Sequence, residues 1–304
     1  MYICDNRENR MRIIDIFSKE KCHKGIEISA ATAIGSYSEN CDVYLIGDKA
    51  VASKENDDYH ECLNDDREVH YVAVFDGMNG EPRAREAALC AAQAIIESPP
   101  KDISDGKRVL VHAGERVEQE FPGSGTTLSL LIWQNDTYSV INAGDSPIYL
   151  LRKGILKQIS EDHSLAGQKK LQGIEPFARD ASYLMKYLGC GVRDIEWNIT
   201  KGKLQAGDLF LLCSDGITKA FSDEKIRKLL KKRKKQTVTE MIVSGAAKRK
   251  NSDNCTAILL SVGTIEGEKE QENQMGACYA TGRGVVQSEE KESSVIQDTT
   301  KGRE

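Results

Sequence analysis

The chain has 304 residues and a formal net charge of −5, with 39% hydrophobic and 29% charged residues. This slightly acidic balance gives no reason to expect a nucleic-acid partner. The sequence has no run of about 18 apolar residues, so we expect no membrane span. The nine cysteines form no C-x-x-C pair, which indicates free thiols rather than disulfides or a zinc site. The start of the chain lacks an apolar signal core, and we therefore expect a cytoplasmic protein.

Composition divides the chain into three parts. Residues 1–25 are polar and mixed, and are interpreted as an N-terminal extension. Residues 26–263 consist of short apolar segments punctuated by Gly and Asp, which is typical of a folded domain. Residues 264–304 are rich in Glu, Gln, Ser, Lys and Gly, so this tail is predicted to be disordered. The basic block 231–235 is interpreted as a solvated helix end or loop, with a docking patch for an acidic partner as the alternative.

Within the central part, apolar runs alternate with short turns. Helical spacing is seen at 81–98, 223–230 and 237–247. The turns within 126–159 are so short that we expect these strands to form one antiparallel meander. The pattern as a whole predicts an α+β layered domain. The predicted strands are 28–34, 43–46, 70–75, 126–133, 137–142, 148–151, 155–159, 208–213 and 255–262.

Five aspartates lie at ends of these predicted strands. Asp76, Asp145 and Asp215 follow apolar strands, whereas Asp42 and Asp253 precede them. Each alone is an ordinary turn residue, and a purely structural role for all five is one alternative. Strand ends of a layered domain can converge on one edge, however, so the set predicts a single acidic cluster.

Such a cluster has a defined chemistry. Neighbouring carboxylates repel one another unless a cation compensates their charge. Oxygen ligands without His or Cys favour Mg²⁺ or Mn²⁺. Two such ions, roughly 3.5–4 Å apart, can hold a bridging water, lower its pKa and support in-line displacement at phosphorus. Gly77, directly after Asp76, would let a backbone carbonyl act as a further ligand.

The motifs around these aspartates resemble those of one family in their order along the chain. The resemblance is to the bacterial branch of the metal-dependent protein phosphatases (type 2C), and it covers about residues 26–262. It rests on the following segments: Val-Phe-Asp76-Gly77-Met78-Asn79-Gly80, Gly125-Thr126-Thr127, Ala143-Gly144-Asp145-Ser146, Ser160-Glu161-Asp162-His163-Ser164, Cys213-Ser214-Asp215-Gly216 and Asp253-Asn254-Cys255-Thr256.

The resemblance implies a fold and a metal centre. The fold would be a four-layer αββα sandwich, with two packed antiparallel sheets flanked by helices. Asp76 would bridge two metal ions, Gly77 would offer its carbonyl, and Asp215 and Asp253 would complete the two-metal core. Asp76, Asp215 and Asp253 would thus be catalytic through a metal-activated water.

Two further aspartates match family positions outside the two-metal core. Asp42 matches a carboxylate that holds metal-bound water. Asp145, together with Asp215, matches a third, weaker metal site. The implied activity is hydrolysis of phosphoserine and phosphothreonine in proteins with two Mn²⁺ or Mg²⁺ ions. The expected partners are a phosphorylated protein substrate and, by family habit, a cognate serine/threonine kinase; we expect a monomer.

Some positions depart from the family pattern. Tyr37 stands where an Arg usually binds the substrate phosphate, and Tyr offers only a neutral hydrogen bond there. Pro147 and Asn79 replace an Arg and a Gly, and segment 164–187, which matches the flap over the site, is short. These departures motivate the alternative of a catalytically weak or silent pseudophosphatase that binds phosphoproteins. His163, with Asp162, is interpreted as capping the turn into the flap rather than as a catalytic base.

Overall fold

The structure is a computed structural model. It describes residues 25–52, 57–62, 68–78, 80–81, 83–177, 179–180, 183–232 and 235–263. Residues 1–24 and the tail 264–304 lie outside the described residues, so the three-part division of the chain stays a prediction. Among the described helices, none is long and apolar enough to cross a membrane.

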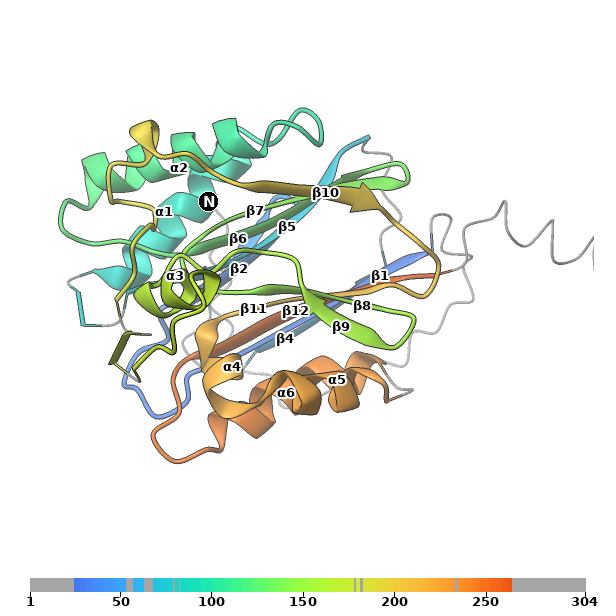
Figure 1. Ribbon diagram of the computed structural model, residues 1–304. Coiled ribbons are helices and arrows are strands. Elements are labelled where there is room, and N and C mark those ends of the chain that lie inside the picture. Colours follow the sequence, from blue (N-terminus) through green and yellow to red (C-terminus); the bar gives the residue numbers. More distant parts are fainter. Residues whose placement is uncertain are drawn as a thin grey trace, which may run out of the picture. The chain divides into compact units, whose positions relative to one another are not determined.

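Two six-stranded antiparallel sheets form the centre of the domain (Figure 1). The first sheet has the strand order β4 (Asp57–Cys62), β1 (Ile26–Ala33), β12 (Cys255–Val262), β11 (Leu209–Cys213), β8 (Ile148–Arg152) and β9 (Ile155–Gln158). The second has the order β10 (Ile199–Lys203), β7 (Thr137–Ala143), β6 (Leu128–Gln134), β5 (His70–Asp76), β2 (Asp42–Ile46) and β3 (Lys49–Val51).

The sheets pack face to face because their facing side chains are apolar. Ile28, Phe210 and Ile258 of the first sheet and Val72 and Leu131 of the second belong to one buried cluster. Alternation along each strand directs the other apolar side chains to the outer faces, where helices cover them. Each sheet is therefore buried on both faces in its central strands.

Helices form the two outer layers (Figure 1). α1 (Ala84–Glu97) and α2 (Gly106–Glu120) cover the second sheet through a shared apolar cluster. α4 (Asp215–Ala220), α5 (Asp223–Leu230) and α6 (Lys235–Ala247) cover the first sheet. The predicted α+β fold, a four-layer αββα sandwich, is confirmed.

The sequence patterns missed α2 and the edge strands β3, β4 and β10. α2 does carry an apolar face, with Val109, Leu110, Ala113 and Val117 buried at helical spacing, and its Gly114 lies on that face. The reason for this glycine is packing: a Cβ there would lie 2.6 Å from both methyl carbons of Val192, in the 3₁₀ helix η2 (Val192–Asp194). Edge strands are short and polar, and therefore show little alternation.

The prediction of one continuous meander over 126–159 is wrong. β6 and β7 pair within the second sheet, whereas β8 and β9 pair within the first. Residues 144–147 therefore cross from one sheet to the other instead of forming a hairpin. This crossing places Asp145 at the junction of the two sheets, beside the flap that begins with α3 (Leu165–Leu171).

Candidate active site

Asp42 and Asp76 are brought together by strand pairing in the second sheet. Asp42 begins β2, Asp76 ends β5, and the antiparallel register places them directly opposite each other. Thr127 fixes the Asp76 backbone: its Oγ1 accepts from Asp76 N over 3.0 Å, and its N donates to Asp76 O over 2.9 Å. The Thr127 hydroxyl also lies 2.7 Å from the Ser146 hydroxyl, which ties the Asp145 turn to the same point.

Asp215 and Asp253 reach the same edge from the first sheet. Asp215 is the first residue of α4 and is separated from β11 only by Ser214, and Asp253 lies just before β12. Ser214 joins the two sheets, since its Oγ donates to Asp42 Oδ2 over 2.7 Å and accepts from Thr256 N over 2.9 Å. The structure thus brings Asp42 from one sheet against the start of α4 from the other.

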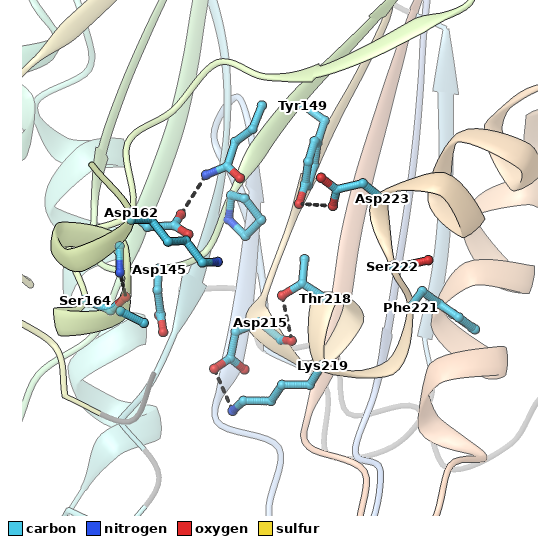
Figure 2. Close-up of a pocket in the computed structure, with 15 residues that line it drawn as sticks. Asp145, Tyr149, Asp162, Ser164, Asp215, Thr218, Lys219, Phe221, Ser222 and Asp223 are labelled. Atoms are coloured by element: carbon cyan, nitrogen blue, oxygen red, sulfur yellow. Dashed lines mark hydrogen bonds and ion pairs between the residues drawn. The ribbon is translucent and has the colours of Figure 1, made fainter. Parts of the chain in front are cut away.

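Lys219 is a charged member of this cluster that sequence reasoning did not single out. It lies four residues after Asp215 on α4, and its Nζ is 2.6 Å from Asp215 Oδ2 and 2.7 Å from Asp253 Oδ2. Figure 2 shows the Asp215–Lys219 pair at the edge of the site, with Asp145 across from it. The Asp-x-x-x-Lys spacing at the start of a helix was a usable signal, because residues four apart face each other on a helix.

The carboxylates are held in an environment that opposes their negative charge. Burial raises the pKa of Asp42 to about 7, against the Ser214 hydrogen bond and with repulsion from Asp215 and Asp253. Burial, then repulsion from Asp42 and Asp215, raises the pKa of Asp76 well above its usual value. The pKa of Asp145 is also raised to about 7 by burial and by Asp215. Without a compensating cation, these groups therefore resist being ionised together.

Lys219 relieves only part of this repulsion. Burial raises the pKa of Asp215 even though the Lys219 ammonium counteracts it. Burial disfavours the charged form of Lys219, but the attraction of Asp215 and Asp253 outweighs it, so the pKa of this ammonium is raised. Lys219 is therefore a firmly charged cation beside the acidic cluster.

The donor set fits hard divalent cations. Asp42 Oδ1 and Asp215 Oδ1 are buried oxygens without a hydrogen-bond partner among the described residues. Within the described ranges, no group of three or more His, Cys, Asp or Glu side chains forms a ready-made metal cage. Mg²⁺ usually keeps several waters and takes only one or two carboxylates, so such a cage is not required.

Gly77 allows the backbone to pass close to the site. A Cβ at this position would lie 2.6 Å from the carbonyl oxygen of Ala84, at the start of α1, and 2.9 Å from that of Cys41. Gly77 N donates to Cys41 O over 3.2 Å, which ties this segment to the residue before Asp42. Only glycine lets three backbone segments meet here.

A pocket of about 340 Å³ opens next to Asp145 and Asp215. Figure 2 shows Asp162 and Ser164 on its flap side, with Thr218, Lys219 and Phe221 of the α4 region opposite. Pro147 and Lys170 also line it. The pocket thus lies between the flap and the cluster.

Tyr37 is placed beside the cluster but not within it. Its side chain is 48% exposed in the loop between β1 and β2. The neighbouring Ser36 N donates to Ser252 O over 3.0 Å, which holds this loop against the residue before Asp253. A role for Tyr37 in substrate binding stays a prediction.

The capping role predicted for His163 is wrong, because neither of its ring nitrogens has a hydrogen-bond partner among the described residues. The helix α3, which follows this turn, is capped by Ser164. Its Oγ accepts from Gly167 N over 3.1 Å. His163 instead packs edge-on against Trp197, with ring centroids 5.6 Å apart, and burial lowers its pKa to about 4. Asp162 accepts from Gln158 Nε2 over 2.7 Å. His163 is therefore a neutral packing residue under the flap.

Comparison with known proteins agrees with this geometry. The family model for protein phosphatase 2C matches residues 46–259. The Mycobacterium tuberculosis serine/threonine protein phosphatase PstP is 27% identical over 206 residues, which are 63% of this chain and 40% of PstP. The Listeria monocytogenes serine/threonine phosphatase Stp is 31% identical over 180 residues, which are 57% of this chain and 70% of Stp. The chain thus spans less than half the length of the mycobacterial relative.

Solved structures share the fold. PppA, described as a key regulatory component of the T6SS in Pseudomonas aeruginosa, is 25% identical with a TM-score of 0.62, over 78% of this chain and 97% of PppA. The catalytic domain of PstP in complex with two manganese ions is 23% identical with a TM-score of 0.58, over 79% and 100% of the two chains.

These matches confirm the resemblance first drawn from the aspartate motifs. The family match covers most of the domain that carries the two sheets and the acidic cluster. With the fold, the strand-end aspartates and the family match in agreement, this chain belongs to the protein phosphatase 2C family and is similar to its bacterial members.

Proposed function

We propose that this chain is a metal-dependent serine/threonine protein phosphatase that hydrolyses phosphoserine and phosphothreonine in proteins with two Mn²⁺ or Mg²⁺ ions. The observation that carries the proposal is the acidic cluster of Asp42, Asp76, Asp145 and Asp215, whose pKa values are all raised. Relatives named serine/threonine phosphatases and the manganese complex of the PstP catalytic domain support it.

The cluster divides into a core and two outer groups. In the core, Asp76 would bridge the ions, Gly77 would contribute its carbonyl, and Asp215 and Asp253 would complete the ligands. Asp42 would hold metal-bound water, and Asp145 would line the outer side of the cluster. Bound divalent ions would supply Lewis acidity at phosphorus and a lowered pKa for the attacking water.

The chain's own residues prepare this site before any substrate arrives. Thr127 fixes the Asp76 backbone, and Ser214 holds Oδ2 of Asp42, whose Oδ1 has no hydrogen-bond partner in the described part of the chain. Fixing the ligands in advance reduces the reorganisation needed when charge develops in the transition state. The site lies beside the 340 Å³ pocket, which offers space for residues that flank the phosphorylated side chain.

The proposal is tested by Mn²⁺-dependent phosphate release from a phosphothreonine peptide. We expect release by the wild-type chain, loss of release with a chelator, and a loss on the order of a hundredfold or more in Asp76→Asn. Lys225→Gln, a change on the exposed side of α5 and outside the pocket lining, serves as the matched control. Metal shown to be bound without any peptide hydrolysis would reject the enzyme and favour the pseudophosphatase alternative, which the named relatives do not favour.

Three finer features belong to the same proposal. A cognate serine/threonine kinase as partner and a monomeric state rest on the family resemblance alone. A cytoplasmic location is supported by Cys41, Cys90 and Cys213, which are buried free thiols. Such thiols are typical of proteins in reducing compartments. Copurification with a kinase, light scattering and fractionation would test these features in turn.

A further inference from the structure

The Lys219 ammonium contacts two carboxylates of the acidic cluster. It lies 2.6 Å from Asp215 Oδ2 and 2.7 Å from Asp253 Oδ2, so it joins two proposed ligands of the metal core. Asp215 and Asp253 side chains are only 17% and 16% exposed, whereas Lys219 is 56% exposed along its side chain. The lysine therefore enters from the solvent side and places its charged end between two half-buried acids.

Lys219 contacts only one oxygen of each of its two carboxylate partners. Lys219 contacts the Oδ2 oxygens of Asp215 and Asp253, whereas Asp215 Oδ1 is buried without a hydrogen-bond partner among the described residues. Asp42 Oδ1, on the opposite sheet, is in the same condition. A carboxylate has two oxygens and about four acceptor positions, so Asp215 can bind the ammonium and a metal ion at once.

Lys219 also lies across the pocket from Asp145. Both residues line the 340 Å³ pocket, and Figure 2 shows Asp145 across from the Asp215–Lys219 pair. Asp145 and Asp215 are the pair expected to bind a third, weaker metal ion. In this chain, a fixed positive charge already lies on one member of that pair and near the other.

Charge balance points the same way. The five aspartates of the cluster carry a formal charge of −5 when ionised, and Lys219 reduces it to −4. Two divalent cations balance that charge completely. A third divalent cation would leave a net positive site and would lie close to the ammonium, where like charges repel.

We propose that Lys219 is a built-in cation that replaces a third metal ion, so that this site binds two divalent ions and excludes the third. The proposal rests on the proposed two-metal function and adds to it the number of ions and the residue that sets it. At the level of sequence, one lysine four residues after Asp215 would determine the metal stoichiometry.

The test counts bound metal in the full chain, without reference to activity. Metal-free protein is dialysed against Mn²⁺ from micromolar to millimolar concentration. Bound manganese is measured by elemental analysis and by the decrease of the electron paramagnetic resonance signal of free Mn²⁺. We expect two ions in the wild type and in Lys219→Arg, which keeps the charge. We expect three in Lys219→Asp, which exchanges the ammonium for a carboxylate, and two in the control Lys225→Gln on the exposed side of α5.

A second measurement is the melting temperature as Mn²⁺ rises. After the first two ions are bound, we expect a further stabilising shift at millimolar Mn²⁺ in Lys219→Asp but not in the wild type or in Lys219→Arg. The same melts show whether each variant is folded, and Lys219→Asn provides a neutral second variant that should also gain a site.

The outcomes separate the two proposals. Three ions in the wild type, or two ions in folded Lys219→Asp and Lys219→Asn, would overturn the role of Lys219 while leaving the phosphatase proposal intact. If the wild type binds no manganese, as expected for Asp76→Asn, both the role of Lys219 and the phosphatase proposal would be overturned. Two ions that become three only when the positive charge is removed would support the proposal.

Discussion

Ser214 Oγ donates a hydrogen bond to Asp42 Oδ2 over 2.7 Å, although the two residues are 172 positions apart in the chain. Asp42 begins β2 of one sheet and Ser214 follows β11 of the other. Strand pairing explains why Asp42 lies beside Asp76, but this hydrogen bond joins the acidic groups of both sheets. It is therefore a sensitive point for both stability and metal binding.

Ser214→Ala should destabilise the metal-free chain. The change leaves Asp42 buried without this donor and removes the acceptor for Thr256 N. Loss of a partner for a buried polar group costs about 1–3 kcal/mol, which urea unfolding can measure. Ser244→Ala on the exposed face of α6 is the control and should change the free energy of unfolding little. Equal effects of the two changes would contradict the structural role of Ser214.

The stability of the metal-free chain should fall as pH rises from about 4 to about 7. The pKa values of Asp42 and Asp145 are raised to about 7 in the folded state, so the folded chain holds more protons than the unfolded chain in this range. Stability then decreases with pH because the buried carboxyls must ionise. His163, whose pKa is lowered to about 4, acts in the opposite sense, but it is one group against several.

This pH dependence is measured by urea unfolding in a chelating buffer. Asp145→Asn should flatten the slope, because an amide does not titrate, and it should stabilise the metal-free chain at pH 7. Saturating Mn²⁺ should also flatten the slope in the wild type, since the cation stabilises the ionised carboxylates. A metal-free wild type whose stability rises steadily from pH 4 to pH 7 would be inconsistent with a buried, uncompensated cluster.

Tyr37→Arg should increase activity toward phosphopeptides. An Arg at this exposed position beside Ser36 and the Ser252 loop would add a charge-assisted, bidentate phosphate contact. Such a contact contributes about 1.5–3 kcal/mol, so kcat/KM should rise roughly tenfold to a hundredfold. Tyr37→Phe is the matched control and should change kcat/KM by less than about tenfold, as expected for one neutral hydrogen bond. No gain in Tyr37→Arg would remove this position from the substrate site.

Gly77→Ala should weaken metal binding and destabilise the fold. Its added Cβ would meet the backbone oxygens of Ala84 and Cys41 at 2.6 and 2.9 Å, so backbone must move. We expect a cost of about 1–3 kcal/mol in unfolding experiments and a lower apparent Mn²⁺ affinity in calorimetry. Gly80→Ala is the control, because no atom lies within 4 Å of its added Cβ; there only the positive φ of +96° contributes strain. Unchanged metal affinity in Gly77→Ala would argue against a backbone ligand here.

Several parts of the site were predictable because short sequence patterns, such as an apolar run that ends at an aspartate, mark them locally. The apolar run of β5 ends at Asp76-Gly77, and β11 ends directly before Ser214-Asp215, so both aspartates could be placed at strand ends. The paired turns of β6–β7 and β8–β9 were also visible as hairpins. What could not be seen was that these two hairpins belong to different sheets, because residues 144–147 have the turn composition of either connection.

The side chains that connect the aspartates of the cluster were harder to predict from the sequence. Lys219 and Ser214 act through contacts with Asp253 and Asp42, which are 34 and 172 residues away. The Asp-x-x-x-Lys spacing could indicate that Lys219 lies near Asp215, but no local pattern links Lys219 to Asp253 or Ser214 to Asp42. The capping of α3 by Ser164 instead of His163 was decided in the same way, since His163 finds its place against Trp197.

The sequence by itself determined the identities of the five aspartates, their places at strand ends and the hard-cation chemistry of an oxygen-only set, because these depend on residue type and local periodicity. Only the tertiary structure decided that Asp42 and Asp76 face Asp215 and Asp253 across two sheets, and that Lys219 lies among them. The physical reason is that burial and mutual repulsion arise only when distant segments meet. Those two effects raise the pKa values of the carboxyls. The same negative charge stabilises the Lys219 ammonium at the edge of the cluster.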